Sequence, residues 1–263
     1  MILDARDVQV AIGGVPILEG ASVDLDAGRL VAVVGPNGAG KSTLVRAAAG
    51  IQRLSGGSVS WMGTDVRRLR GRRLARIRAY VPQRPRVPDG LTVREALRIG
   101  RSAQLGPLRR ATRADHDAVE RSMERAGVTA FAERRLTTLS GGELQRVQIA
   151  VGLSQGAPVL LADEPTSHLD LGATVDVARL LRRLADDGLA VLVVVHDLAL
   201  AAAVADTVVV MSKGRSVAAG PPDAVLEPER IAEVWEVDAA LRRSDGGRTA
   251  LQVDWVGDRI RVP

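Results

Sequence analysis

One glycine-rich stretch restricts the possible folds more than any other part of this sequence. It consists of Gly35, Pro36, Asn37, Gly38, Ala39, Gly40, Lys41, Ser42 and Thr43. The apolar residues 30–34 before it are typical of a buried strand, and residues 44–49 after it are typical of a helix. A strand, a glycine-rich loop and a helix form the context in which G-x-x-x-x-G-K-[ST] binds phosphate groups.

The residue types in this stretch suit an anion. Glycines allow positive φ angles, so the backbone can close around a phosphate, and the helix start directs free N–H groups to the same place. We expect Lys41 to contact the β- and γ-phosphates of a nucleotide and the Ser42 hydroxyl to ligate Mg²⁺. Only two of the 36 basic residues are lysines, so a lysine at this position supports a phosphate contact. The alternative is a glycine turn before an ordinary helix.

Composition excludes several other classes of protein. Hydrophobic residues make up 46% of the 263 residues, which is typical of a globular chain. No apolar run approaches the roughly 18 residues of a membrane span, and the N-terminus lacks the basic start of a signal peptide. The absence of cysteine excludes disulfides and thiolate metal sites. The net charge of +5 is weak evidence for a nucleic-acid or lipid partner.

The order of strand and helix patterns predicts an α/β fold. Residues 1–34 alternate as strands, with turns at Gly13-Gly14 and at residues 26–28, and we expect them to form an antiparallel β subdomain. Residues 91–137 have apolar residues at helical spacing, which predicts a helical subdomain inserted at about residues 84–140. Residues 207–211 are expected to be the last core strand. Residues 1–220 then form the main domain, and residues 221–263 a C-terminal extension packed on it.

Residues 67–78 contain seven arginines, and two interpretations are open for them. They could contact lipid headgroups or nucleic acid. They could instead form the solvated face of a helix whose residues Leu69, Leu74 and Ile77 point inward. We favour the second interpretation, because no aromatic residues alternate with the arginines to stack on bases.

Two later stretches carry candidate site residues. Ser140 is expected to cap a helix that ends near residue 154, with Glu143 completing a capping box, and Gly141 and Gly142 leave room for a second anion. The apolar strand at residues 159–164 ends in two carboxylates, Asp163 and Glu164.

Several motifs in this order resemble the ATP-binding cassette ATPases. They are GPNGAGKST at 35–43, YVPQ at 80–83, LSGGELQR at 139–146, VLLADEP at 159–165, SHLD at 167–170 and VVHD at 194–197. The resemblance covers roughly residues 2–235, and LSGGELQR is its most specific motif. It implies a P-loop NTPase core, a mixed sheet with flanking helices, together with the two subdomains expected above.

The resemblance also implies roles for the matching residues. Asp163 would hold Mg²⁺ opposite Ser42, and Glu164 would act as the general base toward the attacking water. His196 would contact the γ-phosphate, and Gln83 would join the metal and the water. In an ATP-bound dimer, Ser140, Gly141 and Gly142 of one copy would bind the γ-phosphate held by the phosphate loop of the other copy. Glu143 and Asp170 are also expected to be nucleotide-binding residues.

One departure concerns the base of the nucleotide. Such proteins usually have an aromatic residue at the position of Ile12, where it stacks on adenine, so an aliphatic side chain stands here in place of the stacking ring. Trp61 and Trp255 are alternative candidates for covering the base. His116 and His168 suggest no catalytic role.

The segments LTVREALRIGRSAQLG at 91–106 and GRSVAAGPPDAVLEPERIAEVWEVD at 214–238 look like the ATPases of metal-chelate importers. Gln104 replaces a histidine often found at the end of the first segment. We expect an ATP-hydrolysing subunit that powers uptake of ferric siderophore, haem or cobalamin. Its partners would be a dimer of separate permease subunits, a second copy of itself and, indirectly, an extracytoplasmic substrate-binding protein.

This expectation places the chain at the cytoplasmic face of the cell membrane, with no specific nucleic acid as partner. The alternatives are an ATPase subunit of another importer or of an exporter, and a non-transport relative of the DNA-repair or translation type. A simple phosphoryl-transfer kinase has no need of LSGGELQR.

Overall fold

The structure is a computed structural model that describes residues 1–84, 88–105, 110–243 and 249–255. Parts of the expected helical subdomain (85–87 and 106–109) and of the expected C-terminal extension (244–248 and 256–263) lie outside the described residues. The division of the chain at residue 220 stays a prediction.

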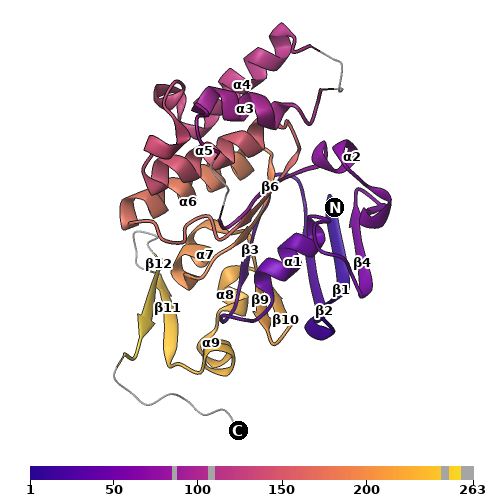
Figure 1. Ribbon diagram of the computed structural model, residues 1–263. Coiled ribbons are helices and arrows are strands. Elements are labelled where there is room, and N and C mark those ends of the chain that lie inside the picture. The colour runs from indigo at the N-terminus through magenta and orange to yellow at the C-terminus, as the bar shows by residue number, and fades with distance from the viewer. Residues whose placement is uncertain (85–87, 106–109, 244–248, 256–263) are drawn as a thin grey trace.

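A mixed ten-stranded sheet forms the centre of the molecule, in the order β5-β4-β1-β2-β10-β9-β3-β8-β7-β6 (Figure 1). Its strands are β1 (Leu3–Ile12), β2 (Val15–Leu25), β3 (Leu30–Val34), β4 (Gly56–Trp61), β5 (Thr64–Asp65), β6 (Arg78–Val81), β7 (Val159–Asp163), β8 (Ala190–Val194), β9 (Thr207–Ser212) and β10 (Arg215–Gly220). Strands β6, β7, β8, β3 and β9 are parallel, whereas β1 pairs antiparallel with β2 and β4. This arrangement confirms the expected α/β class.

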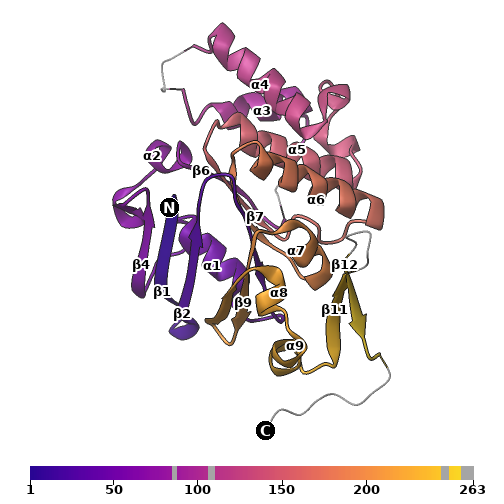
Figure 2. The same cartoon turned by 180° about the vertical axis from the view of Figure 1, so that it is seen from behind.

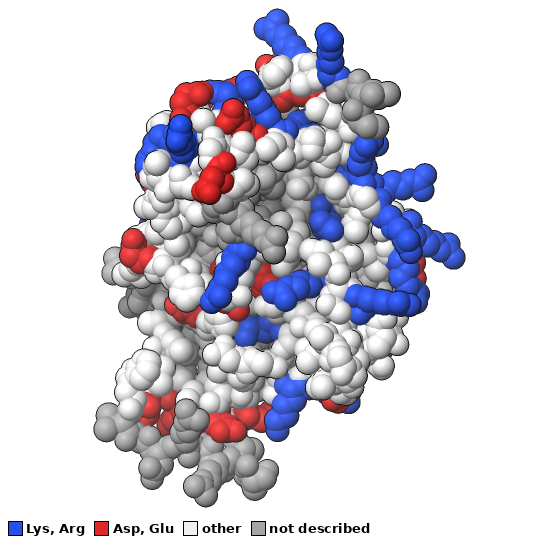
Figure 3. Space-filling view, in the orientation of Figure 1, with Lys and Arg blue, Asp and Glu red and all other residues white. Residues whose placement is uncertain are grey.

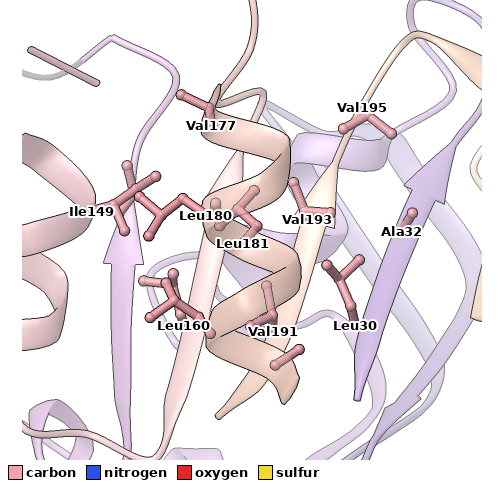
Figure 4. Packing of buried hydrophobic residues seen from close by; sticks show 14 of the residues in the cluster. Leu30, Ala32, Ile149, Leu160, Val177, Leu180, Leu181, Val191, Val193 and Val195 are labelled. Carbon is pink, nitrogen blue, oxygen red and sulfur yellow. The ribbon is translucent and has the colours of Figure 1, made fainter. Parts of the chain in front are cut away.

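The central parallel strands β3, β7 and β8 are buried on both faces, which explains why their sequences are almost entirely apolar. Successive side chains of β3 enter opposite cores. Leu30, Ala32 and Val34 belong to one hydrophobic cluster, and Val31 and Val33 belong to the other. In Figure 4 the first cluster is seen between β3, β8 and α6, where Leu180 and Leu181 pack over the sheet.

The helices cover the two faces of the sheet. They are α1 (Lys41–Ala48), α2 (Arg72–Ala75), α3 (Val93–Arg101), α4 (Arg113–Ala126), α5 (Gly141–Ser154), α6 (Leu171–Asp186), α7 (Leu198–Val204), α8 (Pro222–Val225) and α9 (Pro228–Trp235). Buried residues of α1 join the cluster that contains Trp61, and those of α6 join the opposite cluster. Figure 2 shows α6 and α7 in front of the sheet, with α3 and α4 above α5.

The helices α3 and α4 lie within residues 91–137, as expected, and two short 3₁₀ turns, η2 (Thr129–Phe131) and η3 (Leu136–Thr138), follow α4. Helix α5 packs against both helices and forms one helical layer with them. Leu97, Met123 and Ile149 are fully buried within this layer or beneath it. The helical spacing of apolar residues such as Val93 and Leu97 on α3 and Val119 and Met123 on α4 is therefore explained by one shared core.

Two expectations from the sequence were wrong, one for residues 67–78 and one for the last strand of the sheet. Residues 67–78 do not form one helix, because η1 (Val66–Arg68), α2 and β6 follow one another there and Gly71 takes a φ of 53° that ends the pattern. Leu69 and Leu74 are nevertheless buried as expected. The last strand of the sheet is β10, which pairs with β9 and β2; its sequence RSVAAG is too small and polar to suggest a core strand.

The C-terminal part begins with α8 and α9 and continues into a hairpin of β11 (Ala239–Arg243) and β12 (Thr249–Val253). Ile231 and Val234 of α9 are buried in the same cluster as α6, and β12 lies against α7. This segment therefore packs on the core near His196, which lies two residues after the end of β8.

Candidate functional site

The phosphate loop lies between β3 and α1, where the sequence predicts it. Gly40 is the residue before α1 and has a φ of 93°, a conformation that favours glycine. A Cβ atom on Gly40 would lie 2.6 Å from Leu18 Cδ2, and one on Gly35 would lie 2.2 Å from the carbonyl oxygen of Met211. The loop thus packs so tightly against β2 and β9 that a side chain at these two positions would displace it.

The Lys41 side chain is buried against this loop. Its Nζ donates to the carbonyl oxygens of Gly35 at 2.7 Å and Pro36 at 2.9 Å. Burial lowers the pKa of Lys41 from its usual value, and the carboxylates of Glu164 and Asp163 act in the opposite direction. An ammonium group has three protons, so one remains to donate to a phosphate held in the loop.

Asp163 ends β7 and has no exposed surface. Its Oδ1 accepts a hydrogen bond of 2.7 Å from the Ser42 hydroxyl. Mg²⁺ prefers oxygen ligands and commonly combines one or two carboxylates with phosphate oxygens. A serine hydroxyl and a carboxylate side by side at the phosphate loop fit this ion, as the sequence predicts.

The other oxygen of Asp163 contacts two residues to which the sequence analysis assigned no role. Oδ2 lies 3.2 Å from the Tyr80 hydroxyl and 3.4 Å from Nη2 of Arg46, and Arg46 also donates to Tyr80 at 3.4 Å. Burial raises the pKa of Tyr80, so its hydroxyl stays protonated and can donate. The available signals were slight: Tyr80 is the single tyrosine of the chain, and Arg46 follows Ser42 by one helical turn.

Glu164 lies immediately after β7 in a left-handed conformation, with a φ of 52°. Oε1 is 2.8 Å from Nε2 of His196, and Oε2 accepts hydrogen bonds from the Gln83 amide and from the Ser167 hydroxyl at 2.9 Å. A non-glycine residue in this conformation stores strain that its surroundings must hold, and such strain is common at functional sites. The structure thus brings together Gln83, Glu164 and His196, as predicted.

Two cavities open at this point. A cleft of about 640 Å³ is lined by Asn37, Gln83, Glu164 and His196, and also by His168. A smaller cavity of about 280 Å³ lies between the phosphate loop (Asn37, Gly38 and residues 40–43) and the pair Glu164 and His196. The carboxylate of Glu164 therefore faces the space in which the phosphate loop would hold an anion.

His168 occupies an unexpected place, because the sequence suggested no role for it. It lines the larger cleft and has a φ of 63°. The tight turn that follows Glu164 explains its position.

The residues of the LSGGELQR motif lie elsewhere. Ser140 caps α5 and Glu143 completes the capping box, as predicted, with Oε2 accepting from the Ser140 amide at 2.8 Å. This hydrogen bond lowers the pKa of Glu143, whose Oε1 also pairs with Arg134 at 3.0 Å. Ser140, Gly141, Gly142 and Glu143 line neither of the two cavities at the phosphate loop. One copy of the chain therefore does not bring this motif to its own phosphate loop.

Asp170 caps the neighbouring helix α6 and accepts a hydrogen bond of 2.8 Å from the Ala173 amide. A Cβ atom on Gly142 would lie 2.6 Å from the Cβ of Ala173, so glycine allows the starts of α5 and α6 to approach each other. The free amides at these two helix starts are thus close together on the surface.

The three candidates for contacting the base of the nucleotide differ in their exposure to solvent. Ile12 ends β1 and is 50% exposed, which leaves it free to contact a base. Trp61 is fully buried and donates from Nε1 to the carbonyl oxygen of Ala48 at 2.9 Å, which removes it as an alternative candidate for covering the base. Trp255 is 86% exposed and lines a cavity with His196, Trp235 and Val253. Trp235 also borders the outer side of the phosphate loop, in a cavity lined by residues 36–39.

Among the described residues, no helix combines the length and the apolar character needed to cross a membrane. Within the same part of the chain, no cluster of three or more His, Asp or Glu residues could hold a metal ion by itself. A metal at Ser42 and Asp163 would thus depend on further oxygen ligands, such as those of a phosphate.

Comparisons with known proteins agree with this geometry. The ABC transporter family matches residues 18–167. The hemin import ATP-binding protein HmuV of Rhodococcus jostii is 44% identical over 235 residues, which cover 89% of this chain and 79% of the relative. The cobalamin import ATP-binding protein BtuD of Halobacterium salinarum is 41% identical over 260 residues, which cover 98% of this chain and 65% of the relative.

A solved structure supports the fold. It comes from an ABC transporter described as of metal-chelate type, in an inward-facing conformation, and superimposes with a TM-score of 0.84 at 23% identity, covering 97% of this chain and 98% of the other. With the family match over residues 18–167 and relatives above 40% identity, the chain belongs to the ABC transporter family, as one of its ATPases.

Proposed function

We propose that this chain is the ATP-hydrolysing subunit of a membrane importer for a metal-containing organic molecule, namely ferric siderophore, haem or cobalamin. The names of two relatives, which import hemin and cobalamin, support this substrate class. The alternatives from the sequence are an ATPase of another ABC importer or exporter and a non-transport ABC ATPase. The relatives above 40% identity favour the importer.

In this proposal the phosphate loop binds the triphosphate of ATP. Gly35, Gly38 and Gly40 give the backbone its shape, and amides of the loop and of α1 donate to phosphate oxygens. Lys41 donates to the β- and γ-phosphates. Ser42 and Asp163 would hold Mg²⁺, with Gln83 nearby, and this ion supplies charge neutralisation for the phosphates.

The single observation that carries the hydrolytic role is the arrangement around Glu164. Its carboxylate lines the cavity beside the phosphate loop and is held by His196, Gln83 and Ser167. A carboxylate fixed in this way can accept a proton from a water that attacks the γ-phosphate. His196 and Gln83 position this carboxylate and contact the γ-phosphate and the water.

The complete site needs two copies of the chain. Ser140, Gly141 and Gly142 line neither cavity at the phosphate loop of their own copy, so we infer that they bind the γ-phosphate held by the partner. Glu143 fixes the start of α5, and Asp170 the start of α6, at this interface. ATP closes the dimer, and hydrolysis with product release opens it.

The chain then acts with a dimer of separate permease subunits at the cytoplasmic face of the membrane, and indirectly with an extracytoplasmic substrate-binding protein. Gln83 and the helical layer of α3, α4 and α5 transmit the closing motion to the permease. No specific nucleic acid takes part. This assignment follows from the importer relatives and from the state of Trp61 and Tyr80, the two aromatic residues of the described stretch 50–84, neither of which is exposed.

The test isolates the full chain with its membrane partner in mild detergent, identifies the partner, and reconstitutes the complex in vesicles. We expect ATP hydrolysis to rise when a binding protein loaded with haem, cobalamin or ferric siderophore is added, and the Glu164→Gln complex to show no such rise. The importer assignment would be overturned if the chain copurifies with no membrane protein and duplex DNA stimulates its ATP hydrolysis.

A further inference from the structure

One flank of the molecule carries an excess of positive charge that ATP hydrolysis does not use. Residues 50–84 contain nine arginines and a single acidic residue, Asp65. Six of these arginines are exposed on η1, on α2 or beside them, and we call this surface the basic flank: Arg67, Arg68, Arg70, Arg72, Arg73 and Arg76. Figure 3 shows basic side chains projecting from the side of the molecule where α2 lies in Figure 1.

Little within the described residues neutralises this charge. Arg67 pairs with Asp65, with Nε 3.0 Å from Oδ1, and this contact lowers the pKa of Asp65 to about 2. Arg76 donates to the carbonyl oxygen of Gln104 at 3.3 Å. Within the described part of the chain, Arg68, Arg70, Arg72 and Arg73 form no ion pair, so four guanidinium groups are available to a partner.

The backbone that carries these arginines is well anchored. Leu69 and Leu74 are buried in the cluster that contains Trp61, and the Arg67 amide donates to Asp65 at 2.8 Å. The arginines therefore project from a fixed surface, which lowers the entropy lost when they bind.

A groove of about 560 Å³ adjoins the basic flank and combines apolar and basic character. Ile51, Leu54 and Leu69 provide apolar surface, and Ile51 is 53% exposed. Arginines surround it at positions 53, 67 and 70. A partner that presents phosphate groups next to apolar surface would match both features.

We propose that the basic flank binds the anionic phospholipids of a bilayer. Phospholipid headgroups present phosphates to arginine, and the adjoining acyl region offers apolar contact to Ile51. Nucleic acid also presents phosphates, but single strands require aromatic surfaces for stacking, and the two aromatic residues of this stretch, Trp61 and Tyr80, are not exposed. Binding of the basic flank to lipid would orient the chain toward the membrane that holds the permease, so this proposal extends the proposed importer function and rests on it.

The experiment measures binding of the full chain to sedimenting vesicles of phosphatidylcholine alone or with about one third phosphatidylglycerol. We compare wild type with a variant in which Arg68, Arg70, Arg72 and Arg73 are replaced by Gln. The matched control replaces four arginines that are exposed on α4 and α6 by Gln, namely Arg113, Arg121, Arg179 and Arg183. It changes the net charge by the same amount as the flank variant. Each arginine near an anionic surface contributes up to about fivefold in partitioning.

We expect wild type and the control to bind the anionic vesicles at low salt, and the flank variant to bind at least tenfold more weakly. Binding should weaken as salt rises, and phosphatidylcholine vesicles should not bind. Equal binding by the two variants, or no preference for anionic vesicles, overturns the proposal. Tighter binding to single-stranded or duplex DNA than to the anionic vesicles also overturns it and identifies a nucleic-acid surface.

Failure of this proposal and failure of the importer function give different results. ATP hydrolysis by the isolated flank variant should equal that of wild type, because none of the four arginines lines the cavities at the phosphate loop. If the chain binds anionic vesicles but has no permease partner, the lipid-binding proposal stands and the importer assignment is wrong.

Discussion

The hydroxyl of Tyr80 lies 3.2 Å from Oδ2 of Asp163, so the strand that leads to Gln83 is joined to the carboxylate that faces Ser42. Arg46 contacts the same oxygen at 3.4 Å. The two oxygens of Asp163 thus have separate partners: Oδ2 is held by Tyr80 and Arg46, and Oδ1 is directed toward Ser42 and the ion. Tyr80 and Arg46 are positioning residues in this arrangement.

Tyr80→Phe removes this hydrogen bond and keeps the ring. A hydrogen bond to a charged group contributes about 1.5–3 kcal/mol, and Arg46 retains part of the effect. We therefore expect the Mg²⁺ concentration for half-maximal ATP hydrolysis to rise about threefold to tenfold, with a small change in thermal stability. A Mg²⁺ titration measures this. Arg46→Gln should give a similar shift, and unchanged Mg²⁺ dependence in both variants would contradict the positioning role.

Glu164→Gln keeps the shape of the side chain and removes the proton acceptor. We expect the variant to bind ATP, to lose nearly all turnover and to remain a dimer in ATP and Mg²⁺, as seen by size-exclusion chromatography. The exposed Glu124→Gln on α4 serves as the control and should behave as wild type. A Glu164→Gln chain that stays monomeric and hydrolyses ATP at the normal rate would exclude Glu164 as the base.

A composite site makes a prediction about mixed subunits. Lys41→Ala disables the phosphate loop and Ser140→Arg disables the opposite surface, so a heterodimer of the two variants keeps one intact site. We expect the mixture to recover activity that neither variant has alone.

A second measurement uses the absence of cysteine in the chain. Cysteines introduced at Asn37 and Ser140 should form a cross-link between copies in the presence of ATP. If neither activity nor cross-linking appears, the two-copy site is wrong.

The exposed Ile12 predicts weak recognition of the base. An aromatic stacked on a base contributes about 1–3 kcal/mol, and an aliphatic side chain supplies only apolar contact. Wild type should therefore discriminate poorly between ATP and GTP, and Ile12→Tyr should lower the KM for ATP several-fold with little change in kcat. Trp255→Ala tests the remaining aromatic candidate. Strong preference for ATP that Ile12→Tyr leaves unchanged would place the adenine site elsewhere.

Asp115 predicts a dependence of stability on pH. Hydrogen bonds from Thr112, including one of 2.7 Å from its hydroxyl, hold the pKa of Asp115 at about 2, and Arg101 adds a contact of 3.0 Å. A carboxyl whose pKa is lowered by folding stabilises the protein above its unfolded pKa of about 3.9, and this contribution is lost as the pH falls toward 2.

Asp115→Asn should therefore lower the free energy of unfolding by about 1 kcal/mol at pH 7, and the difference should shrink below pH 4. Urea denaturation across this range measures it. The exposed Asp117→Asn is the control on the same helix. A constant difference between pH 7 and pH 3 would contradict the role of the charge.

The local parts of the site could be predicted from sequence because their signals lie within a few residues. Ser140 and Glu143 form the expected capping box, and Asp163 ends the expected strand. The contact between Tyr80 and Asp163 joins residues 83 positions apart, and only the pairing of β6 with β7 brings them together.

The errors have similar physical causes. The arginines of residues 67–78 suggested one helix, but the conformation of Gly71 and the pairing of β6 with β7 divide the segment. Trp61 was a reasonable aromatic candidate until its burial behind α1 showed that it packs in the core. Strand β10 gave little signal, since none of its residues is buried and only its pairing with β9 and β2 places it in the sheet.

The three tryptophans lie in three different environments. Trp61 is fully buried, Trp255 is 86% exposed, and Trp235 is half-buried beside the outer side of the phosphate loop. Their emission maxima should therefore differ, with buried Trp61 emitting at a shorter wavelength than exposed Trp255. Trp235 can report directly on the loop, so a single-tryptophan chain that keeps only this residue provides an optical signal for nucleotide binding without any added dye.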